Sequence, residues 1–566
     1  MEAARNDDGL EVTSRTQPHP TMNQSAHTPG HRKATEVLQA RGRPLSRRDL
    51  LGLGRHRQPH HPPLLPAAPI AAANLLPART LAAATAAATA AATSLSAAPQ
   101  GGPLFFRSAT ELAAMIRRKE VSVTEVVQAH IDRIHKVNPM LNAVVMPCFE
   151  RALEEAKAAD AALAKGMPKG PLHGVPMTIK DSIETEGVIS TGGTQGRSHH
   201  VPKRDATVVA RLRAAGAILL GKTNTPEFTI GGVSGLGTTA NILHGMTRNP
   251  YDPRHTVYGS SGGAGAIVAA GGAPFDIGSD FGGSIRGPSH ACGIAGIKPT
   301  SGRVPRTGHI VDYGGTFDNY QQLGPMARRV EDLVTLLPII SGPDDLDAAI
   351  HPVPLGDVAS VRIAGLRVAF YTQQGPGAAG ASTEVVAVIA AAAKALESAG
   401  CSVGEDVPPH LMEMDELRRK LTTGDGNAWQ KRLTDRYQTI VPGPARKFNQ
   451  PQVPVADFVA MLERQDAIKS RILTFMEKYD ILICPVRSTP VPRIGDPDKT
   501  ADLAGSGFTS IYNVTGYPAG VVRGGSCSNR LPIGVQVVGR PWTEHVVFAV
   551  MAHLEKVLGG HQPVMV

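Results

Sequence analysis

The sequence predicts an α/β fold in which one large domain, residues 104–566, holds a central mixed β-sheet covered by helices on both faces. Two observations lead to this prediction. Short apolar strands alternate with helical segments along the chain, which is the pattern of a sheet covered by helices. No internal repeat and no clean linker divides residues 104–566, and we expect the stretches 343–360 and 441–454 to be surface insertions.

The first elements are helices with recognisable starts. Ser108–Glu111 and Ser122–Glu125 each place a serine three residues before a glutamate, ahead of apolar residues at helical spacing. This is the capping-box pattern of a helix N-terminus. We expect the second helix to stop at Asn138–Pro139, and a third helix to span residues 149–165.

The strands follow from residue 175 onward. Apolar side chains at alternating positions over residues 175–179 predict a strand. Asp205 is expected to cap a helix that ends at Gly216, and residues 217–221 then form a short buried strand. Residues 275–278 predict another strand.

Charge and cysteine content exclude several classes of function. The net charge is +9, but residues 1–100 hold eleven Lys and Arg against six Asp and Glu, so +5 of it lies there. No basic stripe with interleaved aromatic residues appears in the rest, so we expect no nucleic-acid partner. The five cysteines are odd in number and form no C-x-x-C pair, which speaks against a disulfide framework or a structural zinc site. No run of 18 strongly apolar residues marks a membrane span, and no stable membrane insertion is expected.

Residues 1–103 are expected to be a disordered, low-complexity leader. Within it, Ser46-Arg47-Arg48-Asp49-Leu50-Leu51 precedes an Ala-rich stretch from Leu64 to Ala98, a pattern typical of a twin-arginine export signal. This predicts a periplasmic or secreted protein. The long segment before the arginine pair, the His/Arg/Pro patch at 55–63 and Pro99 depart from the pattern. The alternatives are a cytoplasmic protein with a low-complexity leader, or a misplaced start codon.

Two Gly/Ser-rich stretches suggest chemistry. The turn from Tyr258 to Gly265 leads into an apolar helix over residues 266–270. Alone it fits either a flexible connection or an anion cradle of backbone N–H groups, and it is not a Walker A loop because no Gly-Lys-Ser/Thr follows. Downstream, Gly282 and Gly283 precede Ser284, and their unobstructed N–H groups can converge beside the serine hydroxyl, as a tetrahedral oxyanion requires.

A serine nucleophile needs a base, and a lysine fits better here than a histidine. No histidine lies in an evident relay motif near Ser284. Lys180 ends the apolar strand predicted at 175–179. Burial there lowers the pKa of a lysine and leaves a neutral amine that can accept a proton. Taken alone, the same lysine also fits a surface cap.

Together, these motifs resemble the amidase signature family, over residues 105–560. The stretches that carry the resemblance are Gly174-Val175-Pro176, Lys180-Asp181, Gly259-Ser260-Ser261-Gly262-Gly263, Gly282-Gly283-Ser284-Ile285-Arg286 and Lys298-Pro299-Thr300. The resemblance implies an amidohydrolase that splits the C–N bond of a linear amide into an acid and an amine or ammonia. It implies no metal and no organic cofactor. The expected partner is a small-molecule amide, and a homodimer is the candidate oligomer.

The resemblance also implies residue roles. Ser284 matches the serine that accepts the acyl group, Lys180 matches the base, and Ser260 matches a bridging serine that follows a cis peptide bond and relays protons between them. The residues expected to form the oxyanion hole or contact substrate, together with the Ser284 amide, are Phe281, Gly282, Gly283 and Thr229.

Departures from the family pattern leave the substrate open. Val257-Tyr258 stands where relatives commonly have Pro-Gly. Gly287 occupies a position at which many relatives have a larger residue. Segments 228–232 and 313–320 are expected to line the pocket, but they do not reveal the acyl group.

Two other functions fit parts of the pattern. One is the A subunit of a glutamyl-tRNA amidotransferase, whose Ala-Glu-Ala-Ser-Ser-Asn-Leu-like stretch has no match at Arg418 to Arg432. The other is a non-catalytic binding protein on the same fold. The presence of Lys180, Ser260 and Ser284 speaks against this second alternative.

Overall fold

The computed structural model describes residues 102–230, 239–310, 320–439, 448, 450–496 and 507–564. The predictions made for the leader up to residue 101, for the insertion at 441–447 and for the segments 231–232 and 313–319 lie outside these residues. None of the helices in the described part of the chain has the length and the apolar composition that a membrane span requires.

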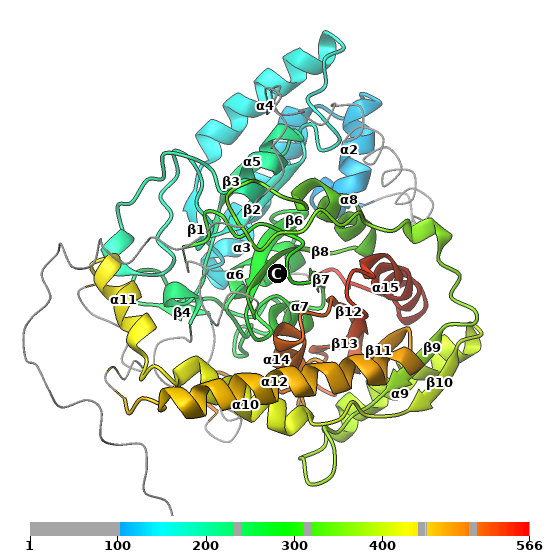
Figure 1. Cartoon of the computed structure of the whole chain (residues 1–566). Helices are drawn as coiled ribbons and strands as arrows, with labels where there is room; N and C mark the ends of the chain where they lie inside the picture. Colours follow the sequence, from blue (N-terminus) through cyan, green and yellow to red (C-terminus); the bar gives the residue numbers. More distant parts are fainter. Residues whose placement is uncertain are drawn as a thin grey trace, which may run out of the picture. The chain divides into compact units, whose positions relative to one another are not determined.

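The described residues form a mixed sheet with eleven strands in the order β1-β3-β2-β6-β8-β7-β12-β13-β11-β9-β10 (Figure 1). Its strands are β1 (Val144–Pro147), β2 (Pro176–Lys180), β3 (Ile218–Thr223), β6 (Phe275–Asp280), β7 (Ala295–Lys298), β8 (Gln322–Ala327), β9 (Arg367–Phe370), β10 (Ser402–Glu405), β11 (Ile481–Pro485), β12 (Ala519–Ser526) and β13 (Pro532–Gly539). β2 runs parallel to β3 and β6, whereas β6, β8, β7, β12, β13 and β11 are antiparallel in succession. The strands β4 (Ala240–Asn241) and β5 (Gly245–Met246) form a separate pair.

Helices cover both faces of the sheet, as predicted. They are α2 (Ala109–Arg117), α3 (Val123–Leu141), α4 (Phe149–Ala164), α5 (Thr207–Ala214), α6 (Gly262–Ala269), α7 (Arg286–Cys292), α8 (Val330–Ile340), α9 (Thr383–Ser398), α10 (Leu411–Thr423), α11 (Ala428–Arg436), α12 (Val455–Phe475), α14 (Gly507–Val514) and α15 (Glu544–Leu558). Two glycines of adjacent strands show that helices pack on opposite faces of the sheet. Gly520 of β12 faces Met551 of α15, whereas Gly534 of β13 faces His290 of α7. Because Gly520 pairs with Val537, three residues beyond Gly534, the two glycines point to opposite faces. α15 also contacts α8 and α9 on its side, and α7 contacts α6 on the other.

The N-terminal helices begin where the sequence predicts. Ser108 and Ser122 both form complete capping boxes with their glutamates. The predicted stop of α3 at Asn138–Pro139 was wrong, because the helix continues to Leu141. Pro139 removes only one backbone hydrogen-bond donor, so the helix continues past it for two residues. The Asn138 side chain accepts the N–H groups of Ala143 and Val144, and Asn142 adopts a left-handed conformation.

Asp205 does not cap a helix, contrary to the prediction. The N-cap of α5 is Ala206, without a side-chain hydrogen bond. The Asp205 carboxylate instead accepts the Glu186 N–H at 2.8 Å and pairs with Arg213 at 3.0 Å. The predicted strands are present as β2, β3 and β6, and the stretch 343–360 lies mostly at the surface with one short turn, Val358–Ser360.

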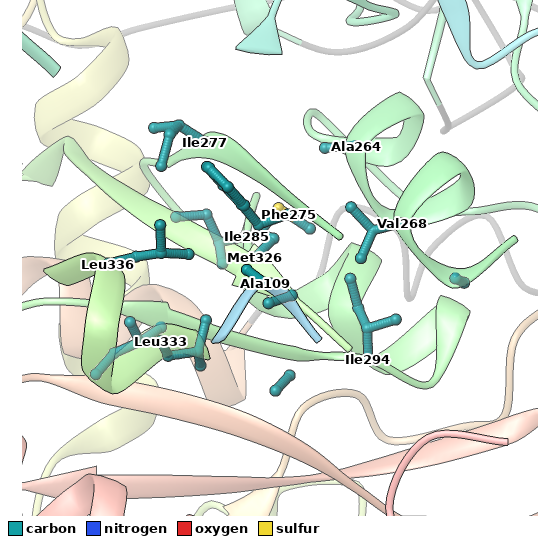
Figure 2. Close-up of a cluster of buried hydrophobic side chains, with 14 of the residues drawn as sticks. Ala109, Ala264, Val268, Phe275, Ile277, Ile285, Ile294, Met326, Leu333 and Leu336 are labelled. Carbon is teal, nitrogen blue, oxygen red and sulfur yellow. The ribbon is translucent and has the colours of Figure 1, made fainter. Parts of the chain in front are cut away.

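A buried apolar cluster holds β6 between its neighbours. Figure 2 shows Phe275 of β6 and Met326 of β8 in this cluster, with Val268 of α6 and Leu333 of α8 contributing to it. All four side chains are fully buried. Burying a side chain of this size contributes roughly 1.5–3 kcal/mol. The cluster therefore fixes the strand that delivers the chain to Ser284.

Candidate active site

Lys180 ends β2 with its side chain fully buried among hydroxyl groups. Its Nζ donates to Ser260 Oγ at 2.6 Å, to Ser261 Oγ at 2.9 Å and to Ser279 Oγ at 2.9 Å. The structure thus brings together Lys180 and Ser260, as the sequence led us to expect. Ser261 and Ser279 are two further partners that were not foreseen.

Strand geometry explains this meeting. β2 and β6 are parallel, so their carboxyl ends lie at the same edge of the sheet. Lys180 ends β2, and Ser279 is the penultimate residue of β6. Ser260 and Ser261 lie immediately before α6, which starts at Gly262, inside the Gly-rich motif and four residues earlier than predicted. The Gly259–Ser260 peptide bond is cis, as the family resemblance implies.

The surroundings of Lys180 favour the neutral amine. Burial lowers the pKa of Lys180 to about 7, although the carboxylates of Asp280 and Asp276 act in the opposite direction. An appreciable fraction of the side chain is therefore unprotonated at neutral pH. The Ser260 and Ser279 hydroxyls can each donate or accept a hydrogen bond, so both protonation states of Lys180 can be accommodated. The Ser261 hydroxyl accepts from Lys180 and donates to the Ser279 carbonyl oxygen at 3.2 Å.

Ser284 lies at the end of the nucleophile loop, residues 281–284, which connects β6 to α7. Its side chain is partly exposed, and its hydroxyl makes no hydrogen bond to any described residue. The Ser284 carbonyl oxygen accepts the Ser261 N–H at 3.2 Å. This bond places the nucleophile loop beside the turn that carries Ser260.

The backbone N–H groups of the nucleophile loop do not all point in the same direction. The Gly283 N–H donates to Asp280 Oδ1 at 2.7 Å, and the part of Gly283 in the oxyanion hole stays a prediction. The N–H groups of Gly282 and Ser284 donate to no described residue. These two amides are the ones that the geometry leaves available, and the roles of Phe281 and Gly282 stay predictions.

The buried ion pair of Asp280 and Arg286 holds the two ends of the nucleophile loop. Asp280 Oδ2 accepts Arg286 Nε at 3.0 Å and the Ile285 N–H at 3.0 Å, and its Oδ1 accepts Arg286 Nη2 at 2.8 Å and Asn513 Nδ2 at 2.9 Å. Burial alone would raise the pKa of Asp280, but the Arg286 guanidinium and these donors hold it well below its usual value. Asp280 therefore stays ionised and orients the backbone around Ser284.

The comparisons with known proteins identify the family. The family model described as Amidase matches residues 125–548. The chain belongs to the amidase signature family. The described residues hold no group of three His, Cys, Asp or Glu side chains placed to bind a metal ion.

Relatives of this amidase are catalysts of amide chemistry. An indoleacetamide hydrolase of Bradyrhizobium diazoefficiens is 34% identical over 483 residues, covering 81% of this chain and 88% of the relative. The A subunit of a glutamyl-tRNA(Gln) amidotransferase from Moorella thermoacetica is 36% identical over 471 residues, covering 78% and 94%. The solved structure of a 6-aminohexanoate cyclic dimer hydrolase superposes with a TM-score of 0.73 at 29% identity, covering 82% and 99%. The chain is an amidohydrolase.

The residues that sequence reasoning missed in this amidase surround the predicted ones. Asp280 and Arg286 flank the Gly-Gly-Ser motif, six positions apart, and that opposite-charge pair was the signal available. Ser279 was marked only by its place next to Asp280. Asn513 had no local signal, because it reaches the loop from α14, more than 200 residues away.

Thr229 and Tyr320 lie in the two segments predicted to line the pocket. Thr229 ends a short 3-10 turn, Glu227–Thr229, and its N–H donates to Pro226 O at 2.8 Å. No hydrogen bond joins it to Lys180, Ser260 or Ser284, and its role stays a prediction. Tyr320, at the end of the predicted pocket segment 313–320, packs edge-on against Phe281 with ring centroids 5.8 Å apart. That end of the segment borders the nucleophile loop.

Proposed function

We propose that this enzyme hydrolyses the C–N bond of a small carboxylic amide through a Ser284 acyl-enzyme, with Ser260 and Lys180 as the proton relay. One observation carries the proposal: a fully buried lysine donates to Ser260 at 2.6 Å, beside the loop that bears Ser284. Relatives named for the hydrolysis of indoleacetamide and of an aminohexanoate dimer support the same bond type.

The first half-reaction forms the acyl-enzyme. Neutral Lys180 accepts the Ser260 proton as Ser260 accepts the Ser284 proton, and Ser284 Oγ bonds to the carbonyl carbon. The carbonyl π electrons move to oxygen, where the N–H groups of Gly282 and Ser284 stabilise the negative charge. The relay then returns the proton to the amide nitrogen, so that the C–N bond breaks with a neutral amine as leaving group.

The second half-reaction releases the acid. Water takes the place of the departed amine, and the relay removes one of its protons as its oxygen bonds to the acyl carbon. The C–O bond to Ser284 then breaks, and Ser284 regains a proton through Ser260. Lys180 ends as it began, so no group is consumed.

Labelling and mutation together test the nucleophile. A fluorophosphonate should label wild-type enzyme at Ser284, whereas Ser284→Ala should lose both labelling and amide hydrolysis while keeping the fold. Ser289→Ala is a matched control, because Ser289 is a buried serine of α7 whose hydroxyl donates to Ile285 O at 2.9 Å and to no other described residue. It should label normally. A label mapped to another serine would overturn the assignment.

One observation favours a second candidate function, the A subunit of an amidotransferase. Several curated relatives carry that name, at 33–36% identity. The sequence from Arg418 to Arg432, at α10 and α11, lacks the stretch expected for such a protein. Purified enzyme that releases ammonia from glutamine only with a partner protein, and hydrolyses no other amide, would support this candidate instead.

The leader and the oligomeric state belong to the same proposal. The Arg47–Arg48 pattern favours export through the twin-arginine route, and N-terminal sequencing of the native protein should find a start near residue 99. An intact Met1 in an exported fraction would exclude cleavage. Light scattering on the purified protein tests the homodimer, and a monomer mass would contradict it.

A further inference from the structure

We propose that α14 clamps the nucleophile loop and that Thr509 is a positioning residue for the oxyanion donors. This inference rests on the proposed function, because it concerns the amides of Gly282 and Ser284. α14 contributes no group to the proton relay. Two of its side chains, Thr509 and Asn513, bond to the backbone on which the relay acts.

The peptide unit between Gly282 and Gly283 is held at both ends. Thr509 Oγ1 donates to the Gly282 carbonyl oxygen at 2.8 Å, and the Gly283 N–H donates to Asp280 Oδ1 at 2.7 Å. A peptide unit is planar, so two hydrogen bonds at opposite edges fix its orientation. The free N–H groups of Gly282 and Ser284 lie on either side of this unit. Its orientation therefore decides where both of them point.

A second α14 side chain holds the start of the loop. Asn513 Nδ2 donates to the Asp280 carbonyl oxygen at 3.0 Å and to Asp280 Oδ1 at 2.9 Å. Asn513 and Thr509 are four residues apart and share one face of the helix. The helix backbone takes part as well, since Arg286 Nη1 donates to the Thr509 carbonyl oxygen at 2.8 Å.

The close approach of α14 also accounts for a glycine. Gly283 has φ +119°, and a Cβ at this position would overlap the Thr509 side chain. Thr509 is fully buried, so it cannot swing aside into solvent. The loop and the helix therefore fit only with glycine at 283.

The neighbouring serine provides a matched control. Ser510 Oγ donates to Asp415 Oδ1 of α10 at 2.8 Å. It is also a fully buried hydroxyl in the same helical turn, but its bond is directed towards α10 and not towards the loop. Its removal costs a hydrogen bond that is at least as strong, because the acceptor is a carboxylate, and leaves the loop contacts intact.

The chemical consequence is a change in rate more than in binding. Removing one oxyanion donor outright costs about 10²–10³ in kcat. Releasing the clamp leaves both donors present but less well aimed, so we expect a loss on the order of 10-fold in kcat with little change in KM.

The test measures the rate at which a fluorophosphonate labels Ser284 in the full-length chain, because the phosphoryl oxygen uses the same donors and no substrate need be known. Thr509→Val should slow labelling on the order of 10-fold. Thr509→Ser should restore it, and Ser510→Ala should label at the wild-type rate. An amide that the wild type turns over, with 4-nitroacetanilide as the first probe, then separates kcat from KM.

The outcomes distinguish the two proposals. If wild-type enzyme is not labelled at Ser284, the proposed function fails. If wild type is labelled and Thr509→Val labels equally fast, only the clamp is overturned, and the same holds if Ser510→Ala is slowed as much as Thr509→Val. Should the valine variant not fold, judged by its melting temperature, Thr509→Ala takes its place with the same expected loss.

Discussion

Asp276 is a buried carboxyl on the same face of the sheet as Lys180, and its removal should change the pH dependence of the enzyme. In the register of β2 and β6 it stands opposite Thr178, whose hydroxyl donates to Oδ2 at 2.7 Å. Thr223, the register partner of Lys180, donates to the same oxygen at 3.0 Å. Burial raises the pKa of Asp276 to about 7, against the opposing effects of these donors and of Lys222 and Lys180.

The charges around this pair set the sign of the effect. The carboxylates that raise the pKa of Lys180 are Asp280, which Arg286 neutralises, and Asp276. Burial lowers the pKa of the remaining cation, Lys222, against the influence of the carboxylates of Asp181, Asp276 and Glu184, which raise it. Asp276→Asn removes a negative charge that favours the ammonium form. The pKa of Lys180 should therefore fall.

The size of the fall follows from the spacing of the strands. Diagonal neighbours on adjacent strands lie about 7 Å apart, and at an effective dielectric constant of about 20 two unit charges then interact by about 2 kcal/mol. This corresponds to roughly 1.5 pKa units. Because Asp276 is about half ionised near pH 7, we expect the acidic limb of kcat/KM to move down by about one pH unit.

The assay is kcat/KM from pH 5 to 9 for wild type, Asp276→Asn and Glu555→Gln. Glu555 is a buried carboxyl at the contact of α8 and α15 and is not among the charges that act on Lys180, so its variant should keep the wild-type limb. Thr223→Val removes one hydrogen-bond donor from the Asp276 carboxylate, which raises the pKa of Asp276 and leaves less negative charge beside Lys180. The acidic limb of kcat/KM should therefore also move down, by less than in Asp276→Asn. An acidic limb that stays in place in Asp276→Asn would refute the reasoning.

Three further predictions concern single residues. Lys180→Ala should lower kcat/KM about 10²–10⁴-fold at pH 7 and recover in part at high pH, and a parallel pH profile would rule Lys180 out as the base. Gly283→Ala should lower both activity and melting temperature, because φ is +119° and Thr509 occupies the space; an unchanged melting curve would contradict the close fit. Burial raises the pKa of Glu555 to about 8, so its contribution to stability is present at low pH and lost as pH rises through 8, by up to about 1.4 kcal/mol per pH unit. Urea unfolding of Glu555→Gln from pH 5 to 9 should therefore show a shallower decline than wild type, and equal slopes would show that Glu555 is not held protonated.

Local signals sufficed for the strands that carry the site, whereas the roles of Lys180, Ser260 and Ser284 came from the resemblance to a family and stay predictions. Alternating apolar residues marked β2, and the glycines before Ser284 marked a loop that needs close backbone approach. What the sequence could not reveal depends on contacts made across the fold. The direction of the Gly283 N–H is set by Asp280 at the end of β6, and Asn513 reaches the loop only because α14 packs there. The predicted helix cap at Asp205 was wrong for the same reason, because its carboxylate bonds to the Glu186 N–H and to Arg213 and not to the first turn of α5.

The hydroxyl shell of Lys180 has a consequence for which nucleophiles the enzyme accepts. A hydroxyl exchanges donor for acceptor by rotating about its C–O bond. The Ser261 hydroxyl also donates to the Ser279 carbonyl oxygen at 3.2 Å, whereas the Ser260 hydroxyl bonds to Nζ and to no other described residue, so its proton has no fixed direction. In the proposed mechanism, the relay that protonates a departing amine can equally deprotonate an arriving one. An added amine such as hydroxylamine should then compete with water for the acyl group. The ratio of hydroxamate to acid would report how readily the amine enters the pocket before water hydrolyses the acyl-enzyme.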